Sequence, residues 1–174
     1  MTQPISQTIR PVADDEWEVV GWLWQAYRSD LAPIVHGLPY ADGRYAHGPL
    51  DGYPAPDRVG YLAFCPHPNT GAAAPVGFAL VSGLDGERRH MDAFWTAPAA
   101  RRGGLGLALA AHVVARHPGA WAIAFQHDNS AAAGFWRRVA AELFGPETEG
   151  WTEELRPVPG KPEVPPDHWI ETAL

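Results

Sequence analysis

The apolar residues of this chain repeat with two different periods, and in the stretch that begins at residue 58 the strand-like period changes to a helical one near residue 97. Before that point, the stretches 58–65, 76–82 and 89–96 are rich in aliphatic and aromatic residues and are separated by Asn, Asp and Gly. This pattern predicts three strands joined as an antiparallel meander. A further short strand is predicted at 8–12.

After residue 97, the apolar residues recur at helical spacing. From Leu105 to Val113 they follow one helical face, and Pro118 and Gly119 predict the end of that helix. Mixed spacing of this kind indicates the α/β (α+β) class. The same reasoning predicts a strand at 121–125, a helix that opens near Asn129 and ends at Gly145, and two last strands at 151–155 and 168–172.

The N-terminal region combines a helix with a long loop. The acidic residues at 14–16 and the helical spacing of Trp17, Val20, Trp24 and Leu31 predict a helix over roughly 14–28. Residues 29–57 are rich in Pro and Gly, which break regular elements. Because a loop of this length in a compact domain is usually functional or disordered, its scattered tyrosines favour an ordered lid or substrate wall. A short second helix is also compatible with this segment.

Length and composition indicate one globular domain over residues 1–174. Hydrophobic residues make up 46% of the chain and charged residues 19%. No apolar run approaches the ~20 residues of a membrane-spanning helix, and the N-terminus lacks the features of a signal peptide. The single cysteine, Cys65, allows no internal disulfide. We therefore expect a cytoplasmic protein with no membrane partner.

The charge is distributed unevenly. The net charge of −7 argues against nucleic acid as the main partner. Residues 88–138 contain seven arginines and two aspartates, a net charge of +5, whereas the rest of the chain contains six basic and 18 acidic residues, a net charge of −12. This pattern favours a small anionic ligand held beside acidic walls, although arginines on exposed helix faces would produce the same pattern.

The segment from Pro98 to Gly106 has the chemistry of an anion cradle. It runs from a predicted strand into a helix, whose first N–H groups have no intrahelical partner and carry the positive end of the dipole. Glycines allow the backbone to approach a ligand closely, and Arg101 and Arg102 add charge. These features together predict a pyrophosphate site.

Two other kinds of phosphate-binding loop share some of these features. A nucleotide P-loop is excluded, because no Gly-Lys-Ser or Gly-Lys-Thr follows. A dinucleotide fingerprint is a weak match, because Leu109 stands where the third glycine is required. Asp128 lies at about the right distance for a ribose contact, which leaves this alternative open.

The arrangement Arg101-Arg102-Gly103-Gly104-Leu105-Gly106, with Pro98 upstream, resembles the acetyl-coenzyme A motif of the GNAT N-acetyltransferases. The segment 129–136 resembles the second motif of the same superfamily, and the resemblance covers roughly 60–140. It implies a central, mostly antiparallel, twisted sheet of six to seven strands with a V-shaped splay, flanked by about four helices. It also implies transfer of an acetyl or short acyl group from acetyl-CoA to a primary amine by direct attack, without a covalent enzyme intermediate.

The resemblance implies a role for several residues. The backbone at Phe94 and Thr96 would bond the acyl carbonyl and the pantetheine, the N–H groups from Arg102 to Gly106 would hold the pyrophosphate, and Asn129 and Phe135 would contact the pantetheine arm. The full set of expected cofactor-binding residues is Phe94, Trp95, Thr96, Arg101, Arg102, Gly103, Gly104, Leu105, Gly106, Asn129, Phe135 and Trp136.

The catalytic residues are less well defined. His90 stands where some members of the superfamily carry a carboxylate base, and His90 and Asp92 share one strand face by two-residue alternation, as do Phe94 and Thr96. We expect His90 and Asp92 to be catalytic. Many members carry a tyrosine acid at the position of Trp136, and an indole cannot supply that proton.

The acceptor is expected to be a small-molecule or peptide amine, contacted by Tyr27, Asp30 and Tyr40, and acidic and aromatic side chains together would favour a cation. No metal is expected, and homodimers are common in such folds. Two alternatives remain open at this point: a non-catalytic acyl-CoA-binding module or sensor, which Trp136 favours, and a dinucleotide-binding enzyme.

Overall fold

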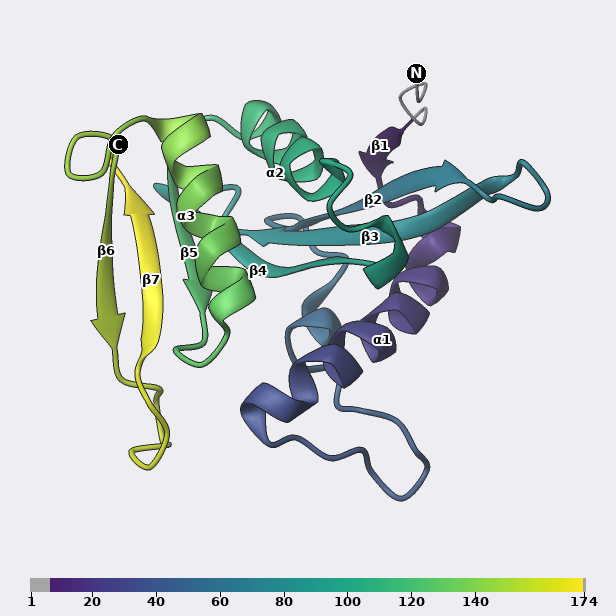
Figure 1. The fold of residues 1–174 in the computed structure, drawn as a ribbon, viewed down its shortest axis with the longest axis horizontal. Helices are drawn as coiled ribbons and strands as arrows, with labels where there is room; N and C mark the ends of the chain where they lie inside the picture. The colour runs from purple at the N-terminus through teal and green to yellow at the C-terminus, as the bar shows by residue number, and fades with distance from the viewer. Residues whose placement is uncertain (1–6, 174) are drawn as a thin grey trace.

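The computed structural model describes residues 7–173, and it is built around a single seven-stranded sheet (Figure 1). The strand order is β1-β2-β3-β4-β5-β7-β6, and every neighbouring pair is antiparallel except β4 and β5. The strands are β1 Thr8–Pro11, β2 Val59–Pro66, β3 Ala73–Ser82, β4 Arg88–Thr96, β5 Ala120–Phe125, β6 Trp151–Arg156 and β7 Asp167–Thr172. The helices are α1 Trp17–Val35, α2 Leu105–Arg116 and α3 Ser130–Phe144, with 3-10 helices η1 Asp14–Glu16, η2 Gly48–Gly52 and η3 Pro98–Ala100.

The structure confirms the mixed α/β class and the meander, and the predicted strands agree with the observed ones to within a few residues. The core has two parts, one on each face of the sheet. Leu109 of α2 and Val139 of α3 pack with Trp121 and Ile123 of β5 on one face. On the other face, Trp24 of α1 and its buried neighbours pack with residues such as Leu62, Phe78 and Leu80. Among residues 7–173, no helix combines the length and apolarity needed to cross a membrane.

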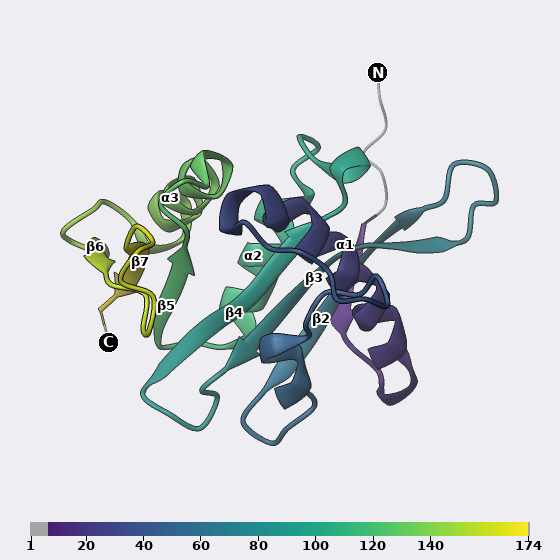
Figure 2. The ribbon, with the colours of Figure 1, turned by 90° about the horizontal axis from the view of Figure 1, so that it is seen from below.

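The parallel strands β4 and β5 pair only over their first halves. The register runs from Arg88↔Ala120 to Met91↔Ile123 and ends there, and Figure 2 shows the two strands diverging beyond this point. The end of β4, from Phe94 to Thr96, therefore has no partner on β5. The expected V-shaped splay is this opening, and it leaves the end of β4 without a strand partner on that side.

A bulge at Asp92 changes which way β4 faces. Leu80 pairs with Ala93 and Val81 pairs with Met91, so Asp92 is an extra residue with no partner on β3. Strict alternation would place Phe94 on the same face as His90 and Asp92. Because of the bulge, Phe94 instead packs against the core under α2 and α3.

The N-terminal helix is longer than the predicted 14–28. It begins as η1 and continues as α1 to Val35, passing through Pro33, because a proline in the last turn removes only one helical hydrogen bond. The predicted loop therefore begins near residue 36, and the one helix within 36–57 is the short η2. Residues 7–173 contain three α-helices and three 3-10 helices, and the resemblance implies about four helices. The loop is ordered against α1: the Trp24 indole donates to the Ala46 carbonyl (2.9 Å), and the Gln25 side chain bonds both backbone groups of Tyr45.

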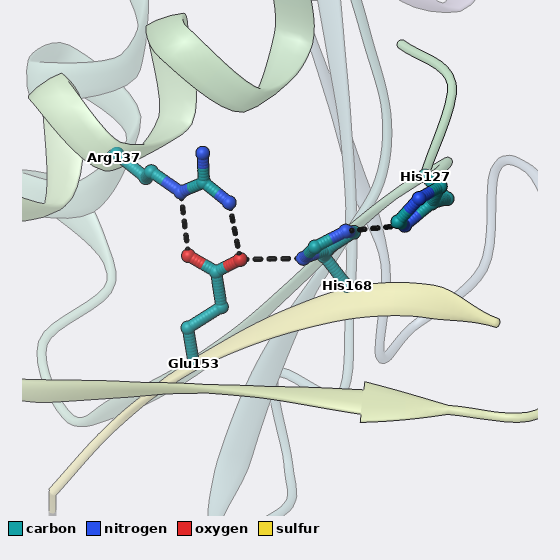
Figure 3. Close-up of polar contacts among 4 residues, drawn as sticks. All are labelled: His127, Arg137, Glu153 and His168. Carbon is teal, nitrogen blue, oxygen red and sulfur yellow. Dashed lines mark hydrogen bonds and ion pairs between the residues drawn. The ribbon is translucent and has the colours of Figure 1, made fainter. Parts of the chain in front are cut away.

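A line of four polar side chains fastens the C-terminal hairpin to α3 (Figure 3). Arg137 of α3 donates two hydrogen bonds of 2.7 Å to Glu153 of β6. The Glu153 carboxylate lies 2.5 Å from Nδ1 of His168 on β7, and Nε2 of His168 lies 3.0 Å from Nδ1 of His127. Hydrogen bonds from Arg137 lower the pKa of Glu153, and the bond from His168 acts in the same direction.

We expect Glu153→Gln to lower the free energy of unfolding by about 1–2 kcal/mol near neutral pH, because it removes the negative charge to which Arg137 and His168 are hydrogen-bonded. Since the pKa of Glu153 is lowered on folding, its contribution is complete above the ordinary carboxyl pKa of about 4.3 and is lost as the pH falls through the lowered value. Urea unfolding at neutral pH and near pH 3 measures the difference. Glu142→Gln, which breaks the exposed α3 pair with Arg138, is the control and should cost at most about 0.5 kcal/mol. A difference between wild type and Glu153→Gln that persists unchanged at acid pH would contradict the assignment.

Candidate active site

The glycine-rich loop between β4 and α2 forms a backbone cradle at the open end of the V. After η3, Arg102 (φ 65°) and Gly104 (φ 83°) adopt left-handed conformations, and α2 begins at Leu105. No side chain of the described residues caps α2, so its first N–H groups are available to a ligand. Together with the positive end of the helix dipole, these donors favour an anionic ligand at this position.

A cavity of about 670 Å³ adjoins this cradle. It is bounded by α1, the end of β4, the glycine-rich loop and α3, and therefore reaches from the cradle to the helix on the other face of the sheet. Its principal lining residues are Tyr27, Asp30, Leu31, Ile34, Phe94, Trp95, Thr96, Arg101, Arg102, Gly104, Gly106, Asn129, Phe135, Trp136 and Arg138. Most of the residues that the sequence motifs predict for the cofactor are thus brought together.

Aromatic rings form one wall of the cavity. The ring of Phe94 lies 5.3 Å from that of Phe135 and 5.0 Å from that of Trp136, measured between centroids. Gly106 lies directly beside them: a Cβ there would lie 3.1 Å from a ring carbon of Phe135, so a side chain would displace that ring by a few tenths of an ångström. The second glycine of the motif therefore allows the Phe135 ring to pack closely against α2. Trp136 is buried and has only its indole to offer, so it packs here and cannot act as an acid.

Asn129 opens α3 at the edge of the same cavity. Its Oδ1 accepts a hydrogen bond of 3.1 Å from the N–H of Ala132, which is N-cap geometry. The amide nitrogen of Asn129 lies 3.4 Å from Oε1 of Gln126. Asn129 therefore caps α3, and its side chain lies at the wall of the main cavity.

Three arginines line the cavity, and they differ in their partners. Arg101 pairs with Asp30 at 2.6 Å, and Arg138 pairs with Glu142 at 2.6 Å. Arg102 makes no ion pair with any residue of the described chain, 7–173. The uncompensated positive charge at the cradle thus comes from Arg102 and the N-terminus of α2.

A second, smaller cavity of about 200 Å³ lies on the α1 face of the sheet, where β4 and β5 separate. His90 and Asp92 line it, together with Pro49, Met91, Ala122, Ala124 and Trp169. The two oxygens of Asp92 accept hydrogen bonds of 2.8 Å from the hydroxyls of Tyr53 and Ser82. Burial, followed by the charge of Asp92, raises the pKa of the Tyr53 hydroxyl, which therefore remains a donor to the carboxylate.

The His90 imidazole has no hydrogen-bond or ion-pair partner within residues 7–173. In the part of the chain that the structure describes, no group of three or more His, Cys, Asp or Glu side chains is arranged as metal ligands.

Other predicted site residues lie in varied places. Tyr27 lines the main cavity but packs edge-on against Trp24 and Phe78, so it is largely a core residue. Tyr40 lines neither cavity; it lies in an exposed turn in which its N–H bonds the Arg44 carbonyl.

Leu105 is buried in the core, Gly103 does not line the main cavity, and the Trp95 indole faces α1. Sequence reasoning missed Tyr53 and Ser82, the partners of Asp92. No pattern could have found Tyr53, because only the fold of the loop brings it to β4.

Comparison with known proteins gives a family and a fold. The family model described as the acetyltransferase (GNAT) family matches residues 17–140. A search of curated protein sequences finds no match.

Several solved structures resemble the whole chain. The ribosomal-protein-S18-alanine N-acetyltransferase from Escherichia coli has 14% identity and a TM-score of 0.60, with 97% of this chain and 93% of that chain covered. NAA60 from Arabidopsis thaliana, solved in complex with acetyl-CoA, has 12% identity and a TM-score of 0.64, with 95% and 97% covered. An acetyltransferase from Thermus thermophilus has 17% identity and a TM-score of 0.62, with 99% and 100% covered.

At these identities, the solved structures establish the fold alone. The family model, in contrast, spans both the glycine-rich loop and the α3 motif, and it includes all of the residues that line the main cavity. Because its match covers well over half of the sequence, this chain belongs to the GNAT acetyltransferase family.

Proposed function

We propose that this protein transfers an acetyl or short acyl group from acyl-coenzyme A to a primary amine. The observation that carries this proposal is the cavity at the open end of the V, which joins an uncapped helix N-terminus to the unpaired end of β4. Residues 1–174 would act as one catalytic domain. Support also comes from the related fold of NAA60, which was solved with acetyl-CoA.

The residues of the cavity fit acetyl-CoA. The backbone N–H groups from Arg102 to Gly106 would hold the pyrophosphate, and the Arg102 side chain would pair with a phosphate. The apolar wall of Phe94 and Phe135 would contact the pantetheine arm. The cofactor supplies the thioester, whose carbonyl is attacked by the acceptor.

The reaction needs a neutral amine, and the second cavity offers the groups that prepare one. Asp92, held by Tyr53 and Ser82, carries no cationic partner among residues 7–173 and would attract the protonated amine. His90 is free of hydrogen bonds there and would remove the proton. The amine nitrogen then bonds to the acyl carbon and the carbon–sulfur bond breaks.

The departing thiolate needs little assistance. Trp136 supplies no proton, but the thiolate of a thiol with a pKa of about 8.5 is a competent leaving group. A backbone N–H at the unpaired end of β4, near Phe94, would polarise the carbonyl during attack. No covalent enzyme intermediate is required.

A second candidate function is a non-catalytic acyl-CoA-binding module, which the tryptophan in place of an acid favours. The two functions predict the same ligand and differ only in turnover with amines. Thiol release in the presence of any primary amine would exclude the second.

Thermal unfolding with acetyl-CoA, NAD or ATP, each alone, tests the proposal. Acetyl-CoA at about 100 times its dissociation constant should add ~2.7 kcal/mol of stability and raise the Tm by several degrees, whereas NAD and ATP should not. Thiol release is then measured with a panel of primary amines. A shift with NAD and none with acetyl-CoA would overturn the proposed function.

A further inference from the structure

The side chains of Asp30, Trp95 and Arg101 connect three separate elements, and we call this group the Asp30 bridge. Oδ2 of Asp30, on α1, accepts a hydrogen bond of 2.8 Å from the Trp95 indole of β4 and one of 2.6 Å from Nη2 of Arg101. Nε of Arg101 also donates to the carbonyl of Thr96 at 2.9 Å. The bridge thus ties α1 to the glycine-rich loop through the end of β4.

The last turns of α1 have few other attachments. Beyond Trp24, the only residue of α1 that is buried is Leu31. Pro33 has no N–H, so the carbonyl of Ser29 lacks its helical hydrogen bond, and the helix ends in a left-handed residue, His36. These same turns place Leu31 and Ile34 in the wall of the main cavity.

The guanidinium of Arg101 is engaged by protein groups, unlike that of an arginine that is free to bind a phosphate. Two of its three nitrogens are already engaged, one by a carboxylate and one by a carbonyl. The charge of Asp30 compensates that of Arg101 within the same cavity. Arg102, the next residue, has no such partner in residues 7–173 and stands in a left-handed conformation at the cradle itself.

We propose that Arg101 is a positioning residue that acts through Asp30. It fixes the C-terminal turns of α1 as the acceptor-side wall of the cavity, and it is not a ligand of the pyrophosphate, although it is the first residue of the glycine motif. That this wall faces the acceptor rests on the proposed function, whereas the connection between α1 and the loop is independent of it.

Hydrogen exchange of the free protein tests the connection without any ligand. Amides in 31–36 should exchange about fivefold faster or more in Arg101→Gln and in Asp30→Asn, because either change breaks the charged pair. The double variant should exchange no faster than the single variants, since the two side chains form one interaction. Arg101→Lys, which restores the charge, should recover part of the protection. Arg102→Gln is the matched control and should leave exchange at 31–36 unchanged.

Acetyl-CoA binding at about 50 mM and about 300 mM KCl tests the role of each arginine. Arg101→Gln should change the dissociation constant less than about threefold and keep the wild-type dependence on salt, whereas Arg102→Gln should weaken binding about tenfold and flatten that dependence.

Unchanged exchange at 31–36 in Arg101→Gln would overturn the proposal, and so would a large, salt-flattened loss of affinity in that variant. If the wild-type protein does not bind acetyl-CoA, the proposed function fails, while the exchange experiment still decides the role of the bridge.

Discussion

Replacement of Gly104 by glutamate is expected to weaken acetyl-CoA binding at least about 100-fold. The new carboxylate would lie at the N-terminus of α2, within a few ångströms of the proposed pyrophosphate, and one such like-charge contact costs about 4 kcal/mol at an effective dielectric constant near 20. The residue also has φ 83°, so any side chain adds backbone strain. Calorimetric titration with acetyl-CoA measures the loss.

Two controls separate charge from strain. Gly104→Ala introduces the strain without the charge and should retain most of the affinity. Gly71→Glu, in the β2–β3 turn, has a similar φ of 71° and equally open surroundings, so it adds the same charge and strain at a remote site. It should bind acetyl-CoA like the wild type. Equal losses in Gly104→Ala and Gly104→Glu would show that loop geometry, and not electrostatics, governs binding.

Replacement of His90 by glutamine is expected to lower kcat by about 10²–10³ with an amine that is turned over, while the dissociation constant of acetyl-CoA stays within about twofold of wild type. The imidazole lines the cavity at the separation of β4 and β5 and has no hydrogen-bond or ion-pair partner within residues 7–173. The deficit should shrink at alkaline pH, because the amine then loses its proton to solvent. Steady-state kinetics over a range of pH values measures both effects.

The control for this variant is His67→Gln, in the exposed turn between β2 and β3, which should change kcat less than about twofold. Asp92→Asn should act differently from His90→Gln, raising the KM for the amine more than it lowers kcat, because it removes the charge that attracts the cation. If His90→Gln retains wild-type kcat at neutral pH, the proton is taken by another group or by water.

The order of the elements and the glycine-rich loop that opens α2 followed from the sequence alone. Both depend on short-range physics: two-residue and 3.6-residue periods of apolar residues define strands and helices, and Gly104 and Gly106 beside arginines are local features of a loop. The same is true of Asn129, whose capping bond spans only three residues. The predicted helix ends at residue 28, whereas α1 continues to Val35. Pro33 removes only one helical hydrogen bond there, and the continued helix buries Leu31.

Tertiary structure decided which way β4 faces and which partner each charge takes. One extra residue at Asp92 reverses the alternation and places His90 and Asp92 opposite Phe94, and a bulge depends on the pairing with β3, which no period in β4 reveals. Arg101 and Arg102 are adjacent and chemically identical in the sequence. Only the folding of α1 across the sheet brings Asp30 to the first and leaves the second free for the cradle, because contacts between residues 71 positions apart are set by the packing of whole elements and not by local preference.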